Sequence, residues 1–377
     1  MLILAGKCSH AAEGVQVPAT DRAISYVGRW GAIERAGQTS MATVNSSSQL
    51  YLTFSGQHVV GLFDIDGIHS LEQIYLRVDQ GDWVLFTIDR PRIEFFPVGL
   101  PVGRHRLEIA VKAVDVGGNR WLPPLSGVIF RGFELEPGAN AEVNPPAREP
   151  LLEFFGDSIT QGEAVLQGDS SAVINSDALA TYAWLAGEAL GTRHVQIAFG
   201  GQGVIRSDSR EVPPAALAFP WNFSGSHADL SVVPDFIVIN QGLNDQADSS
   251  SEFIEAYVGY LREIRKYCPQ ARIFALRPFH GSRYHGDDVA EAVKKMEDPA
   301  IAYIDTTGWL DESDYTDGVH PNLVGQRKAG THIEQVLKPY VSLWKSEHAS
   351  SKVGSVVGLA SSRPPEMRTY LQVRPEF

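Results

Sequence analysis

The sequence has little cysteine, no long apolar run and an excess of acid over base. Only two cysteines, Cys8 and Cys268, occur among 377 residues, which excludes a disulfide framework and a cysteine-rich zinc site. No apolar stretch reaches the roughly 18 residues that a membrane-spanning helix needs, so we expect no membrane insertion. The formal net charge of −13 argues against nucleic acid or an anionic membrane surface as the main partner.

The N-terminus also lacks the pattern of an export signal. The apolar run in residues 1–8 is too short for a signal core, and no basic segment precedes it. A faint similarity to a lipoprotein cleavage site before Cys8 is interrupted by Lys7. We therefore expect a cytoplasmic chain by default, and a secreted one if the sequence is a mature or trimmed form.

Strand patterns fill residues 1–137 almost entirely. Residues 106–112 alternate between apolar and polar side chains, and residues 74–78 and 83–88 form a predicted hairpin. Further strands are expected at 49–54 and 127–135. Short strands without a helical period predict a jelly-roll-like β-sandwich domain. The proline-rich residues 138–150 predict a linker.

From residue 151 the pattern changes to alternating strands and helices. Strands are expected at 151–155, 194–199, 236–240, 272–276 and 301–304. Asp177, Ser251 and Asn322 are candidate caps for helices that end near Leu190, Tyr267 and Val336. This alternation predicts a three-layer α/β/α domain with a parallel sheet over 151–345. Residues 346–377 are rich in Ser, Gly and Pro and predict a disordered tail.

Polar loops follow three of the expected strands. They are 156–158 (Gly-Asp-Ser), 200–203 (Gly-Gly-Gln-Gly) and 241–245 (Gln-Gly-Leu-Asn-Asp). In an open parallel sheet, ligands bind outside the carboxyl ends of the strands, so these loops can converge on one cleft. A late Asp317-Gly-Val-His320 supplies the base and the orienting acid that a serine nucleophile requires. The pattern favours an acyl hydrolase with Ser158 as nucleophile.

Acyl transfer also requires donors for the oxyanion of the tetrahedral intermediate. The Ser158 N–H, the Gly201 N–H and the Asn244 side chain are candidates, because glycine allows close approach and an amide is a neutral donor. Asp157 and Asp245 fit structural roles in their loops better than catalytic ones.

Two other enzyme classes fit the sequence poorly. No Gly-x-Ser-x-Gly elbow occurs, which argues against an α/β-hydrolase. The glycine loop lacks both the G-x-G-x-x-G spacing and a Walker lysine, which argues against nucleotide binding.

The four blocks together resemble the SGNH (GDSL-type) hydrolase superfamily. The resemblance spans about residues 151–340 and implies Ser158 as nucleophile, His320 as base, Asp317 as its partner, and Gly201 and Asn244 as oxyanion donors. The second block often has a serine before its glycine; here Gly200 stands there, so either Gly201 or Gly203 can be the donor. A β-sandwich ahead of such a domain is similar to the two-domain carbohydrate esterases of family two.

Several aromatic and histidine residues are candidates for substrate contact. Trp221, Gly203 and His280 are the positions that we expect near the substrate, although a core or interface role suits Trp221 equally well. His280 and His285, with two aspartates close behind, fit a polar loop at the cleft rim better than any standard zinc spacing.

These observations predict a serine esterase that removes an O-acyl group, first of all O-acetyl, from a carbohydrate. A general short-chain carboxylesterase or lipase-like acylhydrolase, and an inactive carbohydrate-binding homologue, are the alternatives. No cofactor or metal is implied. The expected partner is a small-molecule or carbohydrate ester, and the oligomeric state stays open.

Overall fold

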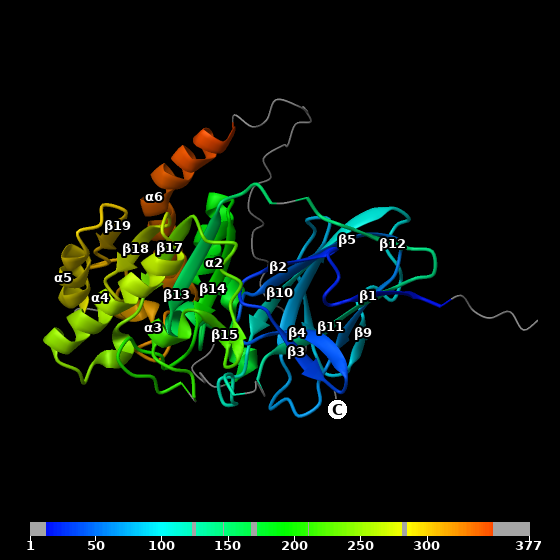
Figure 1. The fold of residues 1–377 in the computed structure, drawn as a ribbon, viewed down its shortest axis with the longest axis horizontal. Helices are drawn as coiled ribbons and strands as arrows, with labels where there is room; N and C mark the ends of the chain where they lie inside the picture. The colour runs from blue at the N-terminus through cyan, green and yellow to red at the C-terminus, as the bar shows by residue number, and fades with distance from the viewer. Residues whose placement is uncertain are drawn as a thin grey trace, which may run out of the picture.

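The computed structural model describes residues 13–122, 126–145, 147–166, 172–209, 211–280 and 285–349. Figure 1 shows antiparallel sheets of the N-terminal half packed beside a parallel sheet with helices on both faces. The predicted fold, a β-sandwich followed by an α/β/α SGNH domain, is confirmed.

Two antiparallel sheets form the sandwich. One has the order β3 (Gly31–Arg35), β4 (Gln38–Thr43), β11 (Val128–Leu135), β6 (Val59–Phe63) and β9 (Arg92–Glu94), with β1 (Val15–Pro18) on β11. The other has the order β12 (Asn140–Glu142), β5 (Gln49–Ser55), β10 (Arg104–Ala113), β7 (Gln73–Val78) and β8 (Val84–Thr87), with β2 (Ile24–Val27) on β5. The stretch expected to be a linker contains strand β12, which pairs with β5 over three residues.

Strand β10 joins the sandwich core to the C-terminal domain. Leu107, Ile109 and Val111 are buried in the sandwich core, on the face that their alternation indicates. The opposite face is exposed at Arg104 and Arg106 but buried at Glu108 and Lys112. Lys112 Nζ donates to the carbonyl oxygens of Val173 and Ser176 in the C-terminal half, at 3.0 and 2.7 Å. A polar face of the sandwich is therefore covered by the second domain.

The parallel sheet has the order β14 (Arg193–Ala198), β13 (Leu151–Gly156), β17 (Phe236–Asn240), β18 (Arg272–Leu276) and β19 (Ile301–Ile304). All of its pairings are parallel. The chain runs outward from β13 on both sides, so the strand order reverses between β13 and β17. In open parallel sheets this switch point is where ligands bind.

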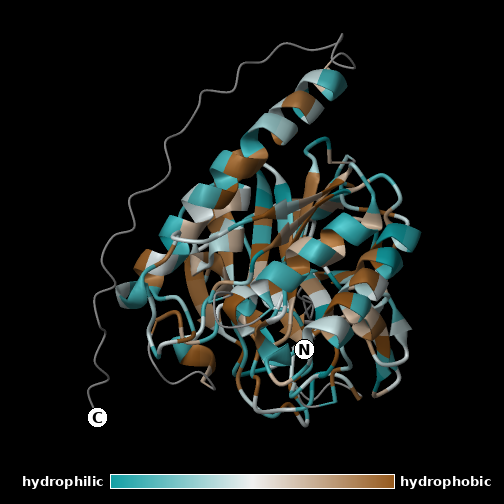
Figure 2. Ribbon diagram, turned by 90° about the vertical axis from the view of Figure 1, so that its left-hand side faces the viewer, coloured by the Kyte–Doolittle hydropathy of each residue, from teal (hydrophilic) through white to brown (hydrophobic). Residues whose placement is uncertain are grey.

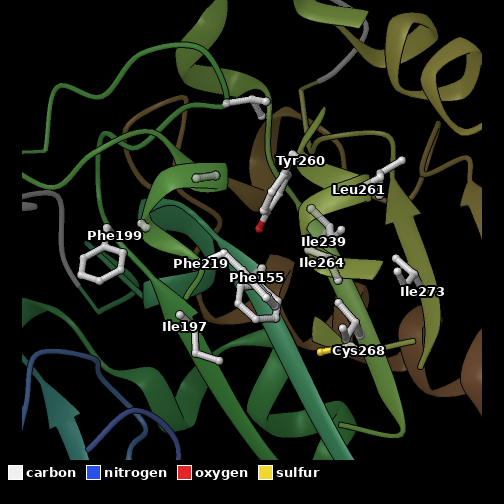
Figure 3. Close-up of a cluster of buried hydrophobic side chains, with 14 of the residues drawn as sticks. Phe155, Ile197, Phe199, Phe219, Ile239, Tyr260, Leu261, Ile264, Cys268 and Ile273 are labelled. Carbon is white, nitrogen blue, oxygen red and sulfur yellow. The ribbon is translucent and has the colours of Figure 1, made fainter. Parts of the chain in front are cut away.

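Helices cover both faces of this sheet. On one face lie α2 (Tyr182–Leu190) and α6 (Leu323–His348). The other face carries α3 (Ala215–Ala218), α4 (Ser250–Tyr267) and α5 (Gly286–Met296). Figure 3 shows this second core, in which Leu261 and Ile264 of α4 lie beside Ile239 and Ile273 of the sheet. Figure 2 shows hydrophilic positions along the outer helices and hydrophobic ones within the layers.

Two helix caps differ from the sequence prediction. Asp177 caps the short 3₁₀ turn η2 (Ala178–Ala180), and Thr181 caps α2 through a hydrogen bond from Trp184 N–H. Helix α4 begins after Ser249, because Glu252 lies three residues later and completes a capping box that Ser251 cannot form.

The last helix begins where predicted but runs further. Asn322 caps α6, which continues past Val336 to His348 and so includes the first residues of the expected tail. Residues 350–377 lie outside the described part of the chain. In that part, no helix combines the length and apolarity needed to cross a membrane. Cys268 is buried and unpaired, and Cys8 lies outside the described residues.

The outer edge of the parallel sheet is closed by the sandwich. Gln196 N–H donates to Ser47 Oγ at 2.7 Å, and Ala198 N–H donates to Asn45 Oδ1 at 3.1 Å. Gln49 Nε2 donates to the His194 carbonyl oxygen at 2.6 Å. Polar side chains of one domain thus satisfy the free edge of β14, in place of a further strand. These contacts end at Ala198, two residues before the glycine loop.

Candidate active site

Ser158 is the first residue of the short helix α1 (Ser158–Gln161), directly beyond strand β13. Asp157 caps this helix by accepting a hydrogen bond from Ile159 N–H at 3.0 Å. Gly156 is required for the turn, because a Cβ there would lie 2.0 Å from Thr160 Oγ1. The Gly-Asp-Ser block is thus a strand-to-helix turn at the switch point of the sheet, and it leaves Ser158 only 7% exposed.

Asp317 holds His320 by both its backbone and its ring. One carboxylate oxygen accepts from the N–H groups of Val319 and His320, at 3.0 and 2.8 Å. The other lies 2.7 Å from His320 Nδ1. Partial burial alone would raise the pKa of Asp317, but the hydrogen bonds from His320 and Val319 outweigh it and lower that pKa. An ionised Asp317 fixes the ring with Nε2 directed away from it.

The ring of His320 faces the loop that carries Ser158. His320 Nε2 lies 3.8 Å from Glu163 Oε2, and Glu163 N–H donates to the Ser158 carbonyl oxygen at 3.0 Å. Among the hydrogen bonds within the described ranges, none joins Ser158 Oγ to His320 Nε2. In unliganded enzymes such bonds are often long and tighten when substrate binds.

The glycine loop offers one backbone donor that its own contacts leave available. Gly203 N–H donates to the Arg206 carbonyl oxygen at 2.8 Å, and Gly200 N–H donates to Gln161 Oε1 at 2.9 Å. No described residue accepts a hydrogen bond from Gly201 N–H, and Gly201 has a φ of +77°. This geometry favours Gly201 over Gly203 as the oxyanion donor.

Asn244 lies in η3 (Leu243–Asp245), just beyond β17. Its Nδ2 donates to the Gln202 carbonyl oxygen at 3.1 Å and to Asp157 Oδ2 at 3.3 Å. The bond to Asp157 is the weaker of the two, and it is the one that a substrate oxygen can replace. Burial raises the pKa of Asp157 to about 7, because it disfavours the charged carboxylate. The serine, glycine and asparagine loops therefore meet around one site.

Asp245 supports the site from behind. Its carboxylate oxygens accept from the N–H groups of Val204 and Ile205, each at 2.8 Å. A Cβ at Gly203 would lie 2.5 Å from this carboxylate, so glycine is needed there for close packing. Gly203 thus has a structural reason for being glycine.

The remaining candidates, His285, His280 and Trp221, make contacts with other parts of the chain. His285 is buried, stacks on Phe253, and bonds Asp288 and the Asp245 carbonyl oxygen, so it lies in the interior and not at a loop rim. His280 packs against the Tyr315 ring with centroids 3.9 Å apart. Trp221 stacks on His227 in the hairpin of β15 (Trp221–Phe223) and β16 (Ser226–His227), which contacts β3. Within the described chain, no group of three or more His, Cys, Asp or Glu side chains is arranged to hold a metal ion.

Two residues of this site were missed by the sequence analysis. Glu163 lies five positions after Ser158, and Arg120 comes from the loop between β10 and β11 of the sandwich. Arg120 Nη1 donates to Gln161 Oε1 at 2.8 Å, and Nη2 donates to Ser209 Oγ at 3.2 Å. The only available signal was the closeness of Glu163 to the serine block; nothing in the sequence pairs Arg120 with it.

The fold and the site define a class of protein. Residues 154–328 match the model of the GDSL-like Lipase/Acylhydrolase family. This part of the chain is therefore a GDSL-like lipase/acylhydrolase domain, as the four sequence blocks indicated.

Comparison of the whole chain narrows the class to a particular architecture. A family two carbohydrate esterase from Cellvibrio japonicus aligns with a TM-score of 0.73 at 18% identity, covering 88% of this chain and 99% of that chain. A family two carbohydrate esterase from Clostridium thermocellum, solved in complex with cellohexaose, aligns with a TM-score of 0.70 at 22% identity, covering 85% and 99%. The chain shares the two-domain fold of these esterases.

One curated relative matches by sequence. Cellulase/esterase CelE of Acetivibrio thermocellus is 30% identical over 186 residues, which are 47% of this chain and 22% of the relative. The chain thus corresponds to about a fifth of that protein's length.

Proposed function

We propose that this protein is a serine esterase that removes an O-acyl group, first of all O-acetyl, from a carbohydrate. The observation that carries the proposal is the 2.7 Å contact between Asp317 and His320 Nδ1, which directs Nε2 toward the loop of Ser158. A base held in one tautomer beside a serine at a helix N-terminus is the arrangement that acyl transfer needs.

The reaction proceeds through an acyl-enzyme. Ser158 Oγ attacks the ester carbonyl carbon while His320 Nε2 accepts the serine proton. The imidazolium, stabilised by Asp317, then gives that proton to the leaving alcohol as the carbon–oxygen bond breaks. Water attacks the acyl-enzyme by the same sequence, and the serine regains its proton as the acid leaves.

The oxyanion is held by donors from three loops. Ser158 N–H lies at the N-terminus of α1, and Gly201 N–H donates to no acceptor among the described residues. Asn244 Nδ2 exchanges its 3.3 Å hydrogen bond to Asp157 for one to the substrate oxygen. Such donors act most strongly when they are fixed before the charge develops.

Similarity supports a carbohydrate as the alcohol. The matched family is one of lipases and acylhydrolases, and several solved proteins that share both domains are family two carbohydrate esterases. One of those structures contains cellohexaose. Acetyl is proposed as the acyl group from this resemblance, and Trp221 and His280 as rim residues that contact the sugar.

The test compares the parent with S158A. We expect the parent to cleave p-nitrophenyl acetate and to release acetate from acetylated xylan or mannan. S158A should lose at least about 10³-fold in kcat while keeping the parent circular dichroism spectrum. A fluorophosphonate probe should label the parent only, because labelling requires a serine activated by His320.

Three results would count against the proposal. Parent-level hydrolysis by S158A would remove Ser158 from the reaction. An unlabelled and inactive parent would favour a carbohydrate-binding protein without activity. Cleavage of simple esters with no acetate released from any polysaccharide would favour a general short-chain carboxylesterase.

A further inference from the structure

The proposed reaction leaves one carboxylate of the site without a role. Glu163 is 7% exposed, and its Oε2 lies 3.8 Å from His320 Nε2, the nitrogen that must accept the serine proton. Asp317 holds the opposite nitrogen of the same ring. The imidazole therefore lies between two carboxylates, of which only Asp317 belongs to the four sequence blocks.

Gly200 provides the space that Glu163 occupies. A Cβ at position 200 would lie 2.0 Å from Glu163 Oε1 and 2.8 Å from its carboxyl carbon. A serine at this position would displace the carboxylate. Gly200 stands where the family often has a serine, and the Glu163 carboxylate occupies the space that a serine side chain would need.

Arg120 stabilises this buried carboxylate from the other domain. Arg120 is 2% exposed, and its guanidinium lies over the Phe199 ring at 5.1 Å from the centroid and donates hydrogen bonds to Gln161 and Ser209. Burial raises the pKa of Glu163, and the positive charges of Arg120 and His320 oppose that rise. A buried carboxylate costs folding free energy unless a cation compensates it, and Arg120 is that cation.

We propose that Glu163, whose charge Arg120 of the β-sandwich compensates, is a positioning residue for His320 that stabilises its imidazolium during proton transfer. The proposal rests on the proposed function, since it assumes Ser158 as nucleophile and His320 as base. The proton moves from Ser158 Oγ to His320 Nε2 and on to the leaving alcohol, and Glu163 gains and loses none. The sandwich thereby supports catalysis through a charge.

The charges that face Glu163 come from three segments of the chain. Arg120 belongs to the β10–β11 loop, His320 and Asp317 to the loop before α6, and Asp157 to the turn before α1. Arg120 attracts Glu163, Asp317 repels it, and the imidazolium attracts both carboxylates. Removing the Glu163 charge takes away the carboxylate 3.8 Å from Nε2 and leaves Arg120 with only Glu72 and Asp115 as anionic neighbours, which makes the imidazolium less stable.

E163Q tests the proposal, because glutamine keeps the shape and removes the charge. We expect kcat for p-nitrophenyl acetate to fall about ten- to a hundredfold with KM within about twofold. The acidic limb of kcat/KM should move to lower pH, since the neutral base persists further into acid. R120K should keep more activity than R120M, because it retains the charge.

The matched control is E142Q. Glu142 also pairs with an arginine, Arg104 at 2.8 Å, but on an exposed part of the sandwich away from the site. This variant should keep the parent kcat and pH profile. Titration of active sites with the fluorophosphonate probe gives the turnover of each competent molecule and removes any effect of a smaller folded fraction.

Two outcomes overturn the inference. One is an E163Q enzyme with the parent kcat and pH profile. The other is a loss of activity that vanishes when rates are counted per labelled site, because Glu163 would then serve folding alone.

If E163Q destabilises the protein, the double variant R120M/E163Q restores charge balance, and it should still show the lower kcat per site. Either failure is separable from that of the proposed function, which S158A decides.

Discussion

At the scale of single residues, the site depends on carboxylates in very different surroundings. Asp317 is partly exposed and its pKa is lowered by hydrogen bonds, whereas burial raises the pKa of Asp157 to about 7 and that of Glu72 to about 8. The same functional group thus serves as a fixed anion at His320 and as a carboxyl that titrates near neutrality below Asn244.

This difference predicts how stability depends on pH. The pKa of Asp157 is about 7 when folded against 3.8 ordinarily, so between these values the folded state holds a proton that the unfolded state has lost. The free energy of unfolding should therefore decrease with rising pH, by up to about 1.4 kcal/mol per pH unit from this group. Urea unfolding of D157N between pH 4.5 and 7.5 should show a shallower decrease.

Glu72 contributes in the same direction, so D157N should flatten the pH dependence without abolishing it. The comparison uses the slope with pH, because a changed bond to Asn244 would shift stability equally at all pH values. A D157N slope equal to that of the parent would contradict the assignment of this titration to Asp157.

At the scale of elements, strand β14 depends on side chains from another domain. Asn45 Oδ1 accepts from Ala198 N–H, two residues before the glycine loop. We expect N45A to lower the free energy of unfolding by about 1–3 kcal/mol, because a buried backbone donor loses its partner. Urea unfolding measures this, and kcat should fall as Gly201 becomes less well fixed.

Thr39 supplies the control for N45A. Its hydroxyl bonds Glu34 on an exposed part of the sandwich, so T39A should change stability little. Equal losses in N45A and T39A would show that β14 does not depend on the Asn45 contact.

The elements also show what the sequence could reveal. The strands of the parallel sheet and Asn322 as a cap were predictable, because buried strands are apolar runs and caps are local. Thr181 and Ser249 were missed in favour of Asp177 and Ser251, since adjacent polar residues compete for the same role. Strand β12 was missed because its pairing with β5 depends on a partner some 85 residues away.

The candidate site likewise contains residues that the sequence could reveal and residues that only the fold brings together. Ser158, Asn244, Asp317 and His320 stand in short blocks whose spacing is visible in the sequence, and their roles stay predictions until S158A and its companions are measured. Arg120 was not predictable, because only packing of the β10–β11 loop against Phe199 brings its charge to the site. The proposed role of Glu163 as a positioning residue depends on the Arg120 charge and on the space left by the absent side chain at Gly200.

At the scale of the whole molecule, the two domains share buried polar contacts. Tyr75 OH donates to Asp177 Oδ2 at 2.7 Å, and Lys112 Nζ bonds two carbonyl oxygens across the same interface. Separating the domains would expose these groups and the edge of β14 together. We therefore expect both domains to unfold in one cooperative transition.

Calorimetry tests this, with calorimetric and van't Hoff enthalpies expected to agree. K112M should lower the midpoint without splitting the transition, because it removes the hydrogen bonds from Lys112 to the Val173 and Ser176 carbonyl oxygens. Two separated transitions, in the parent or in K112M, would show that the domains are independently stable.

The closed edge of β14 has a consequence for protein engineering. Residues Asn45, Ser47 and Gln49 satisfy the backbone that another fold would satisfy with its own strand. A catalytic module transplanted onto a foreign scaffold would carry an unsatisfied strand edge directly before its glycine loop. The smallest transferable unit therefore spans both domains, and a shorter graft would need a designed substitute for those three side chains.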